Sequence, residues 1–166
     1  MKSLAVALMV FLAGATPVDR RVITFYGVGP VRIGVTVVAA AKAAGEPLTP
    51  STETPPGTEA CGHVELASNP HVWFMVEQGR ITRLETASPL FRTASGVRVG
   101  DTEERVRSIY GARLEVQPHK YVDDGHYLIV RSADHKFALV METDGKEVFN
   151  LLAGLVPSVE YVEGCL

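Results

Sequence analysis

The stretch between residues 117 and 126 carries the densest set of side chains that could do chemistry. It contains His119, Asp123, Asp124 and His126, whose nitrogen and oxygen atoms are of the kinds that bind zinc or a similar metal. Their spacing matches no established metal signature, and Asp123-Asp124-Gly125 is equally typical of a turn. We therefore expect no metal and no other cofactor. A metal-dependent hydrolase that uses the segment from His119 to His126 remains as an alternative.

Nucleophilic catalysis has little support in the sequence. A catalytic serine or cysteine needs a base beside it, and no G-x-S-x-G elbow occurs. The two cysteines, Cys61 and Cys165, are an even count, which in an exported chain favours a disulfide over two free buried thiols. Oxidised cysteines are poor nucleophiles. We expect no catalytic residues and a chain that is not an enzyme.

A contact surface has better candidates. In the strand-like run from Val72 to Val76, alternation places Trp73 and Met75 on one face, with Phe74 and Val76 on the other. One pair should face the core. The other pair is either exposed, as in many contact surfaces, or covered by the rest of the chain. We predict a binding surface that contains Trp73 together with His119 and Tyr121, which come from the stretch between residues 117 and 126.

A repeated sequence frame indicates what positions these residues. Val31 to Thr36 and Val97 to Thr102 share the pattern V-R-(I/V)-G-x-T, and each copy has a glycine nine residues further on, at Gly45 and Gly111. The offset of 66 positions (97 − 31) also pairs other residues, including Met75 with Met141. A constant offset over this span predicts one structural unit used twice.

Each copy has the same order of local signals. Thr36 and Thr102 stand where a helix N-cap belongs, and Gly45 and Gly111 where a helix ends, so each helix should have about eight residues. Strand candidates follow at 62–67, 72–77 and 80–86 in the first copy, and at 127–132, 137–142, 146–152 and 158–163 in the second. Gln78-Gly79 and Asp144-Gly145 mark hairpin turns. The Pro-rich and Thr-rich residues 46–59 read as a solvated loop.

These signals predict an α+β fold. We expect two tandem units, each a helix followed by an antiparallel meander, that form one sheet with both helices on one face. Residues 16–87 would be the first unit and residues 88–166 the second, within one compact domain. The other, curved face of the sheet would be free to act as the working surface.

The first residues predict export. Lys2, the apolar run from Leu4 to Ala13 and Ala13-Gly14-Ala15 form a secretory signal peptide over residues 1–15. A transmembrane anchor is the alternative, but the apolar run is too short to span a bilayer. We therefore expect a periplasmic or extracellular protein without a transmembrane segment in its mature form. The net charge of −3 argues against a nucleic-acid partner.

The turn-and-helix frame resembles the helix entry of the β-lactamase-inhibitor-protein-like superfamily. The matching residues are Gly34, Thr36 and Gly45 in the first copy, and Gly100, Thr102, Val106 and Gly111 in the second. That superfamily includes tandem-repeat secreted inhibitors and small outer-membrane assembly lipoproteins. The resemblance implies a helix-then-sheet unit used twice. One disulfide per repeat, usual in the inhibitors, is impossible with two cysteines, and no contact residues carry over.

Together these observations predict a secreted or periplasmic, non-enzymatic protein that binds a protein or an envelope component. An envelope-assembly accessory protein and the metal-dependent hydrolase are the alternatives.

Overall fold

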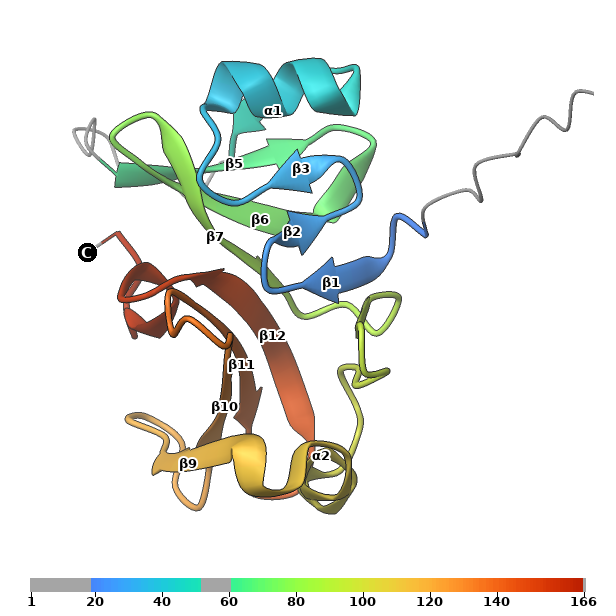
Figure 1. The fold of residues 1–166 in the computed structure, drawn as a ribbon, viewed down its shortest axis with the longest axis vertical. Coiled ribbons are helices and arrows are strands. Elements are labelled where there is room, and N and C mark those ends of the chain that lie inside the picture. The colour runs from blue at the N-terminus through green and yellow to red at the C-terminus, as the bar shows by residue number, and fades with distance from the viewer. Residues whose placement is uncertain (1–18, 52–60, 166) are drawn as a thin grey trace, which may run out of the picture.

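The computed structural model describes residues 19–51 and 61–165, so the expected signal peptide lies outside the described residues. One large antiparallel sheet forms the body of the molecule, with a helix towards each end and a small sheet in between (Figure 1). No helix among the described residues is long and apolar enough to cross a membrane.

The larger sheet has eight strands, and all of its neighbouring strands are antiparallel. In spatial order they are β4 (Leu48–Pro50), β5 (Cys61–Leu66), β6 (Asn69–Glu77), β7 (Arg80–Thr86), β12 (Val148–Leu155), β11 (Phe137–Thr143), β10 (His126–Arg131) and β9 (Leu114–Pro118). The pairing of β7 with β12 joins the two halves. The tight hairpin between β6 and β7 falls at Gln78-Gly79, as predicted, and both residues have positive φ angles of 49° and 74°.

A second, smaller sheet holds four short strands where the sequence predicted a single sheet. Its order is β3 (Val31–Arg32), β2 (Gly27–Val28), β1 (Val22–Thr24) and β8 (Arg92–Thr93), and β1 and β8 are parallel. The chain reverses between Thr24 and Gly27, which pair in the register, and a Cβ atom at Gly27 would lie 2.1 Å from the carbonyl oxygen of Val31. β1 therefore pairs with its own continuation, β2, on one side and with β8 on the other.

Each helix has eight residues and a threonine cap, as predicted. In α1 (Val37–Ala44) the Thr36 side chain accepts a hydrogen bond from the amide of Ala39, and in α2 (Glu103–Tyr110) Thr102 accepts one from Arg105, both at 3.2 Å. α1 ends at a left-handed Gly45. α2 instead continues into a short 3-10 helix, η1 (Gly111–Arg113).

The main core lies between the large sheet, the small sheet and the two helices. Buried members from each part include Phe74 of β6, Ile23 of β1, Ala40 of α1 and Val106 of α2. Phe74 and Val76 point into this core, whereas Met75 and Trp73 point to the opposite side of the sheet, which we call the outer face.

The outer face is not free, contrary to expectation. Residues 156–165, which we call the C-terminal segment, follow β12 and cross the outer face. They include the 3-10 helix η2 (Ser158–Glu160), where the sequence predicted a strand. β12 already pairs with β7 and β11, so the segment has no open sheet edge to join. Val159 packs instead on a second apolar cluster formed by Ile129, Ala138, Val140 and Leu152.

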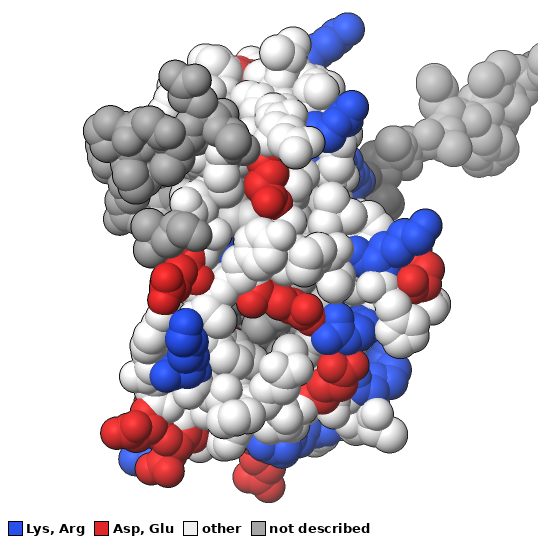
Figure 2. All heavy atoms as spheres, turned by 90° about the vertical axis from the view of Figure 1, so that its left-hand side faces the viewer, with Lys and Arg blue, Asp and Glu red and all other residues white. Residues whose placement is uncertain are grey.

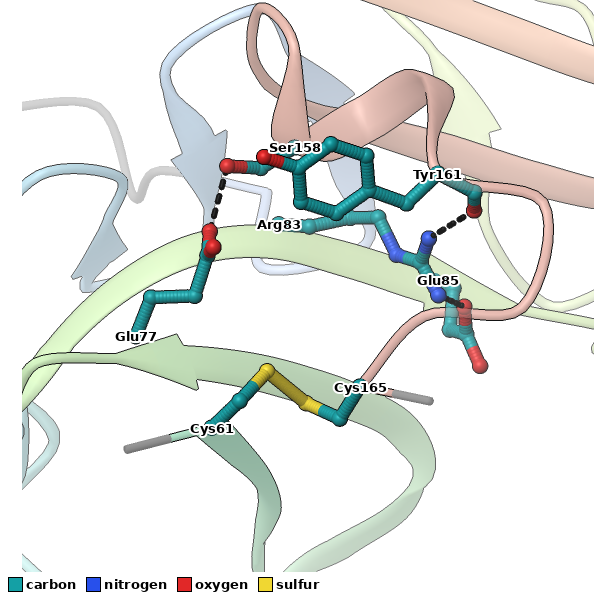
Figure 3. Close-up of a disulfide and its surroundings, with 7 residues drawn as sticks. All are labelled: Cys61, Glu77, Arg83, Glu85, Ser158, Tyr161 and Cys165. Carbon is teal, nitrogen blue, oxygen red and sulfur yellow. Dashed lines mark hydrogen bonds and ion pairs between the residues drawn. A yellow bond between two sulfur atoms is a disulfide. The ribbon is translucent and has the colours of Figure 1, made fainter. Parts of the chain in front are cut away.

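The disulfide predicted between Cys61 and Cys165 is present, with a Cα–Cα distance of 5.4 Å. It ties the end of the C-terminal segment to β5, on the other half of the sheet (Figure 3). This bond fits an oxidising compartment, where disulfides persist.

Both edge strands of the large sheet were missed by the sequence patterns, and each ends in a proline. The amides of Ser51 and His119 bond inward, to His63 and Gly125. Because successive strand amides alternate sides, the nitrogens of Pro50 and Pro118 face away from the sheet. β4 lies within the stretch predicted as a loop, whose residues 52–59 are outside the described residues.

Candidate functional site

The two histidines of the stretch between residues 117 and 126 lie on opposite sides of the large sheet. His119 follows β9 on the outer face, whereas His126 begins β10 with its side chain towards α2. Asp124 has a positive φ of 61° and serves the turn between the two strands. Within residues 19–51 and 61–165, no three His, Cys, Asp or Glu side chains converge as a metal would need. His119 and His126 therefore do not face a common site.

His126 belongs to a polar cluster around Glu103, the first residue of α2. The Glu103 carboxylate accepts hydrogen bonds from the Thr143 hydroxyl, from Arg107 at 3.0 Å and from His126 Nδ1 at 2.7 Å. Burial raises the pKa of Glu103, but the bonds from Thr143, His126 and Arg107 outweigh burial, and the pKa lies below its usual value.

This cluster is not arranged for nucleophilic catalysis. In a triad the hydroxyl bonds to the histidine, and the histidine bonds to the carboxylate. Here the Thr143 hydroxyl and His126 both bond to Glu103 instead, and Thr143 is fully buried. The arrangement fixes the start of α2 against β10 and β11.

His119 is oriented by the turn that follows it. Its Nδ1 atom accepts hydrogen bonds from the amides of Tyr121 and Val122, at 3.1 and 3.2 Å. Nδ1 is therefore unprotonated, and the proton of the neutral ring lies on Nε2, which is 3.9 Å from a carboxylate oxygen of Glu142. The ring stacks on Tyr127 with 4.4 Å between centroids.

Tyr121 lies next to this stack and is 60% exposed. Its hydroxyl donates a hydrogen bond to Glu163 of the C-terminal segment. Lys120 reaches the same carboxylate at 3.6 Å, and its ammonium lies 5.1 Å from the centre of the Tyr121 ring. The loop after β9 and the C-terminal segment thus contact each other on the outer face.

Two arginines hold the C-terminal segment on the sheet. Arg83 of β7 is almost fully buried and donates a hydrogen bond to the Tyr161 carbonyl at 2.8 Å. It also pairs with Glu85 at 2.7 Å, so its guanidinium lies between the segment and β7 (Figure 3). Arg131 of β10 bonds to Glu115 and Glu160, and the hydrogen bond with Glu115 raises its pKa above the usual value.

Two of the hollows beside the segment reach down to the strands of the large sheet. One, of about 120 Å³, has a floor of Ile129, Val140 and Leu152 and is walled by Tyr127 and Tyr161. The other, of about 280 Å³, is more polar and lies over Arg83, Glu85 and Asn150. Seen from this side, the molecule is hollowed near its middle, with acidic and basic side chains interspersed around the hollow (Figure 2).

Several aromatic rings lie on this part of the outer face, and two of them, Tyr127 and Tyr161, line the smaller hollow. We call this group the aromatic patch, and its members are His119, Tyr121, Tyr127, Phe149 and Tyr161. Phe149 lies 5.8 Å from His119 between ring centres, and it is 38% exposed, while Tyr161 is 39% exposed. Two of the three residues predicted for a binding surface, His119 and Tyr121, lie in the patch.

Trp73 occupies the outer face on the other half of the sheet. It is half-buried, on β6, opposite Glu65 and Glu85 in the register. β7, β12 and β11 separate it from β10, which carries Tyr127, so it lies outside the aromatic patch.

Three members of the patch were not predicted from the sequence. Tyr127 could have been found from the alternation of β10, where it shares a face with the buried Ile129. Phe149 and Tyr161 carried no comparable signal. Both depend on how the C-terminal segment and the β11–β12 turn lie in space.

Comparison with known proteins identifies a fold and no family. No family model matches the sequence, and no curated protein matches it. The uncharacterized protein YfeY from Escherichia coli has a similar structure, with a TM-score of 0.51, 13% identity, and coverage of 80% of this chain and 98% of that chain. An extracellular protein containing a SCP domain from Bacillus anthracis has a TM-score of 0.48 and 12% identity, over 75% of this chain and 44% of that chain. At these identities the likeness to YfeY concerns the fold alone.

Proposed function

We propose that the chain is an exported, non-enzymatic binding protein whose aromatic patch contacts a protein or a component of the cell envelope. The expected signal peptide and the disulfide between Cys61 and Cys165 both suit a compartment outside the cytosol. Whether this compartment is a periplasm or the extracellular space does not change the proposal.

The aromatic patch carries this proposal. Soluble proteins place few large aromatic side chains together at the surface, and such groups are enriched where a partner binds. Here Tyr127 and Tyr161 line a hollow with an apolar floor, which suits a protruding apolar side chain of a partner. The exposed Tyr121 and the partly exposed Phe149 lie on the same face. The rings are held in place by the bonds of His119 to its turn and of Arg83 to the C-terminal segment. A rigid surface loses little entropy on binding.

We also propose that the fold is a duplicated unit. α1 with β4 to β7 (in residues 16–87) and α2 with β9 to β12 (in residues 88–166) follow the same order, and α1 and α2 begin 66 positions apart (103 − 37). The two halves would then meet through β7 and β12 at a pseudo-twofold axis, with the helices on one face of the large sheet. The working surface would be built mainly from the second unit.

Site-specific crosslinking tests the proposed function. A photoreactive phenylalanine analogue at position 121 is expected to capture a partner from the native exported fraction. The same analogue at position 38, an 80% exposed position on α1, serves as the control and should not capture that partner.

The captured partner is then purified and its affinity measured. Tyr121→Ala and Tyr161→Ala are each expected to weaken binding roughly tenfold, as for aromatic residues at the centre of an interface. Val38→Ala should leave the affinity unchanged. If the tyrosine variants bind as well as the wild type, the patch is not the binding surface. If Trp73→Ala binds the partner as well as the wild type does, the binding surface does not extend to β6.

A further inference from the structure

A further hollow of the described chain lies away from the outer face. It measures about 470 Å³, which is within the range of small-molecule sites. It is enclosed by the turn before β1, the β2–β3 turn, the end of α1, the β5–β6 turn and the residues before β8. Five separate segments therefore meet around one space.

The floor of this hollow is apolar. Leu66, Phe74 and Phe91 line it, and each belongs to the main core. Leu90, which is 50% exposed, adds an apolar wall on one side. The floor cannot move without disturbing the packing of both sheets, so the hollow is largely preformed.

The rim is cationic. Arg20 and Arg21 both line the hollow and are exposed, and within the described residues neither guanidinium makes a hydrogen bond or a close ion pair. Glu46 is the carboxylate in the lining, and it accepts hydrogen bonds from the amide and the hydroxyl of Ser68. Asp19, close by, pairs with Arg92 at 3.0 Å and accepts a hydrogen bond from the backbone amide of Arg21. Neither carboxylate forms a close ion pair with the guanidinium of Arg20 or Arg21 in the described part of the chain, so both guanidinium groups can still bind an anion.

We propose that this hollow binds a small amphipathic anion, with its apolar body on Leu66, Phe74 and Phe91 and its anionic group on Arg20 and Arg21. Guanidinium groups suit carboxylates and phosphates because they offer several donors in a planar fork. This site is separate from the aromatic patch and does not depend on the proposed function.

Matched probes and matched variants test the proposal in the oxidised protein. The probes are 4-phenylbutyrate and its neutral analogue 4-phenylbutanamide, titrated while backbone amide shifts are followed by NMR. The test variant is Arg20→Gln/Arg21→Gln. The control is Arg32→Gln/Arg98→Gln, which removes the same charge from two exposed arginines outside the hollow.

The carboxylate is expected to shift the amides of Gly29, Asn69 and Phe91, which line the hollow. The Arg20/Arg21 variant should bind it roughly tenfold more weakly, because hydrogen bonds to a carboxylate are charge-assisted. The control variant should stay within about twofold of the wild type, since salt screens an exposed charge that does not line the hollow. The neutral analogue should bind roughly tenfold more weakly than the carboxylate. Equal weakening in both variants, equal binding of the neutral analogue, or shifts that map elsewhere would each overturn the proposal.

A second arm distinguishes the two sources of such an anion. Phosphatidylglycerol vesicles that sediment with the wild type, but not with the Arg20/Arg21 variant, would identify a lipid headgroup. Carboxylate binding without vesicle binding would identify a free soluble ligand.

Discussion

Removal of the disulfide should strongly destabilise the fold. The bond closes a loop of 104 positions between Cys61 and Cys165. In the chain-entropy model, closing such a loop lowers the entropy of the unfolded chain by about 16 cal/mol/K, which is about 4.7 kcal/mol at 25 °C. Cys61→Ser/Cys165→Ser is therefore expected to lower the free energy of unfolding by up to about 4.7 kcal/mol. For a chain of this size, that corresponds to a fall in Tm of roughly 10–19 °C.

The full loss requires that the folded C-terminal segment stays in place without the bond. Val159 remains buried in its cluster and Arg83 still bonds to the Tyr161 carbonyl, so these contacts hold most of the segment. If residues 162–165 became more mobile without the bond, the entropy of the folded state would rise, and the free energy of unfolding would decrease by less.

Urea unfolding of the oxidised wild type, the reduced wild type and the double serine variant measures this effect. The last two should agree, because both lack the bond and keep the rest of the chain. A difference below about 0.5 kcal/mol between the oxidised protein and the serine variant, at an unchanged m-value, would refute the closure argument.

Two further predictions concern the helices. The pKa of Glu103 is lowered in the folded state, so its charge stabilises the fold above about pH 4.5, and this stabilisation disappears as pH falls through the folded-state pKa. Glu103→Gln should therefore lower the urea midpoint at pH 7 and have little effect near pH 2; an equal loss at both pH values would contradict this reasoning. Thr36→Ala and Thr102→Ala should each cost about 1 kcal/mol by urea unfolding, because each removes an N-cap bond. Serine at either position keeps the accepting oxygen, and a serine variant as unstable as the alanine variant would show that the cap bond is not the cause.

Local signals in the sequence predicted most of the elements. The capped helices after Thr36 and Thr102, the hairpin at Gln78-Gly79 and the strand at Arg80–Thr86 depend on interactions within a few residues. The types of neighbouring residues determine such interactions, and the structure places these elements as predicted. The cysteine count likewise led to the disulfide.

Features that depend on distant neighbours were not predictable in this way. The prediction of a strand over residues 158–163 was wrong. β12, which precedes these residues, lies inside the sheet between two other strands, and strand propensity does not reveal this position. The small sheet needs β8 to meet β1 from far along the chain. The metal hypothesis grouped His119 with His126 by sequence distance, although the strand pairing places them on opposite faces. The aromatic patch likewise depends on segments that meet only in the folded chain.

The prolines at the two edges of the large sheet have a consequence for self-association. A strand of another molecule that approached β4 or β9 would need a regular row of outward amides to pair with. Pro50 and Pro118 interrupt that row, and the outward amide of Leu114 is already bonded to the Gly111 carbonyl. Both flanks are therefore poor templates for the strand of another molecule, and we expect concentrated protein to resist open-ended growth by strand addition at these edges.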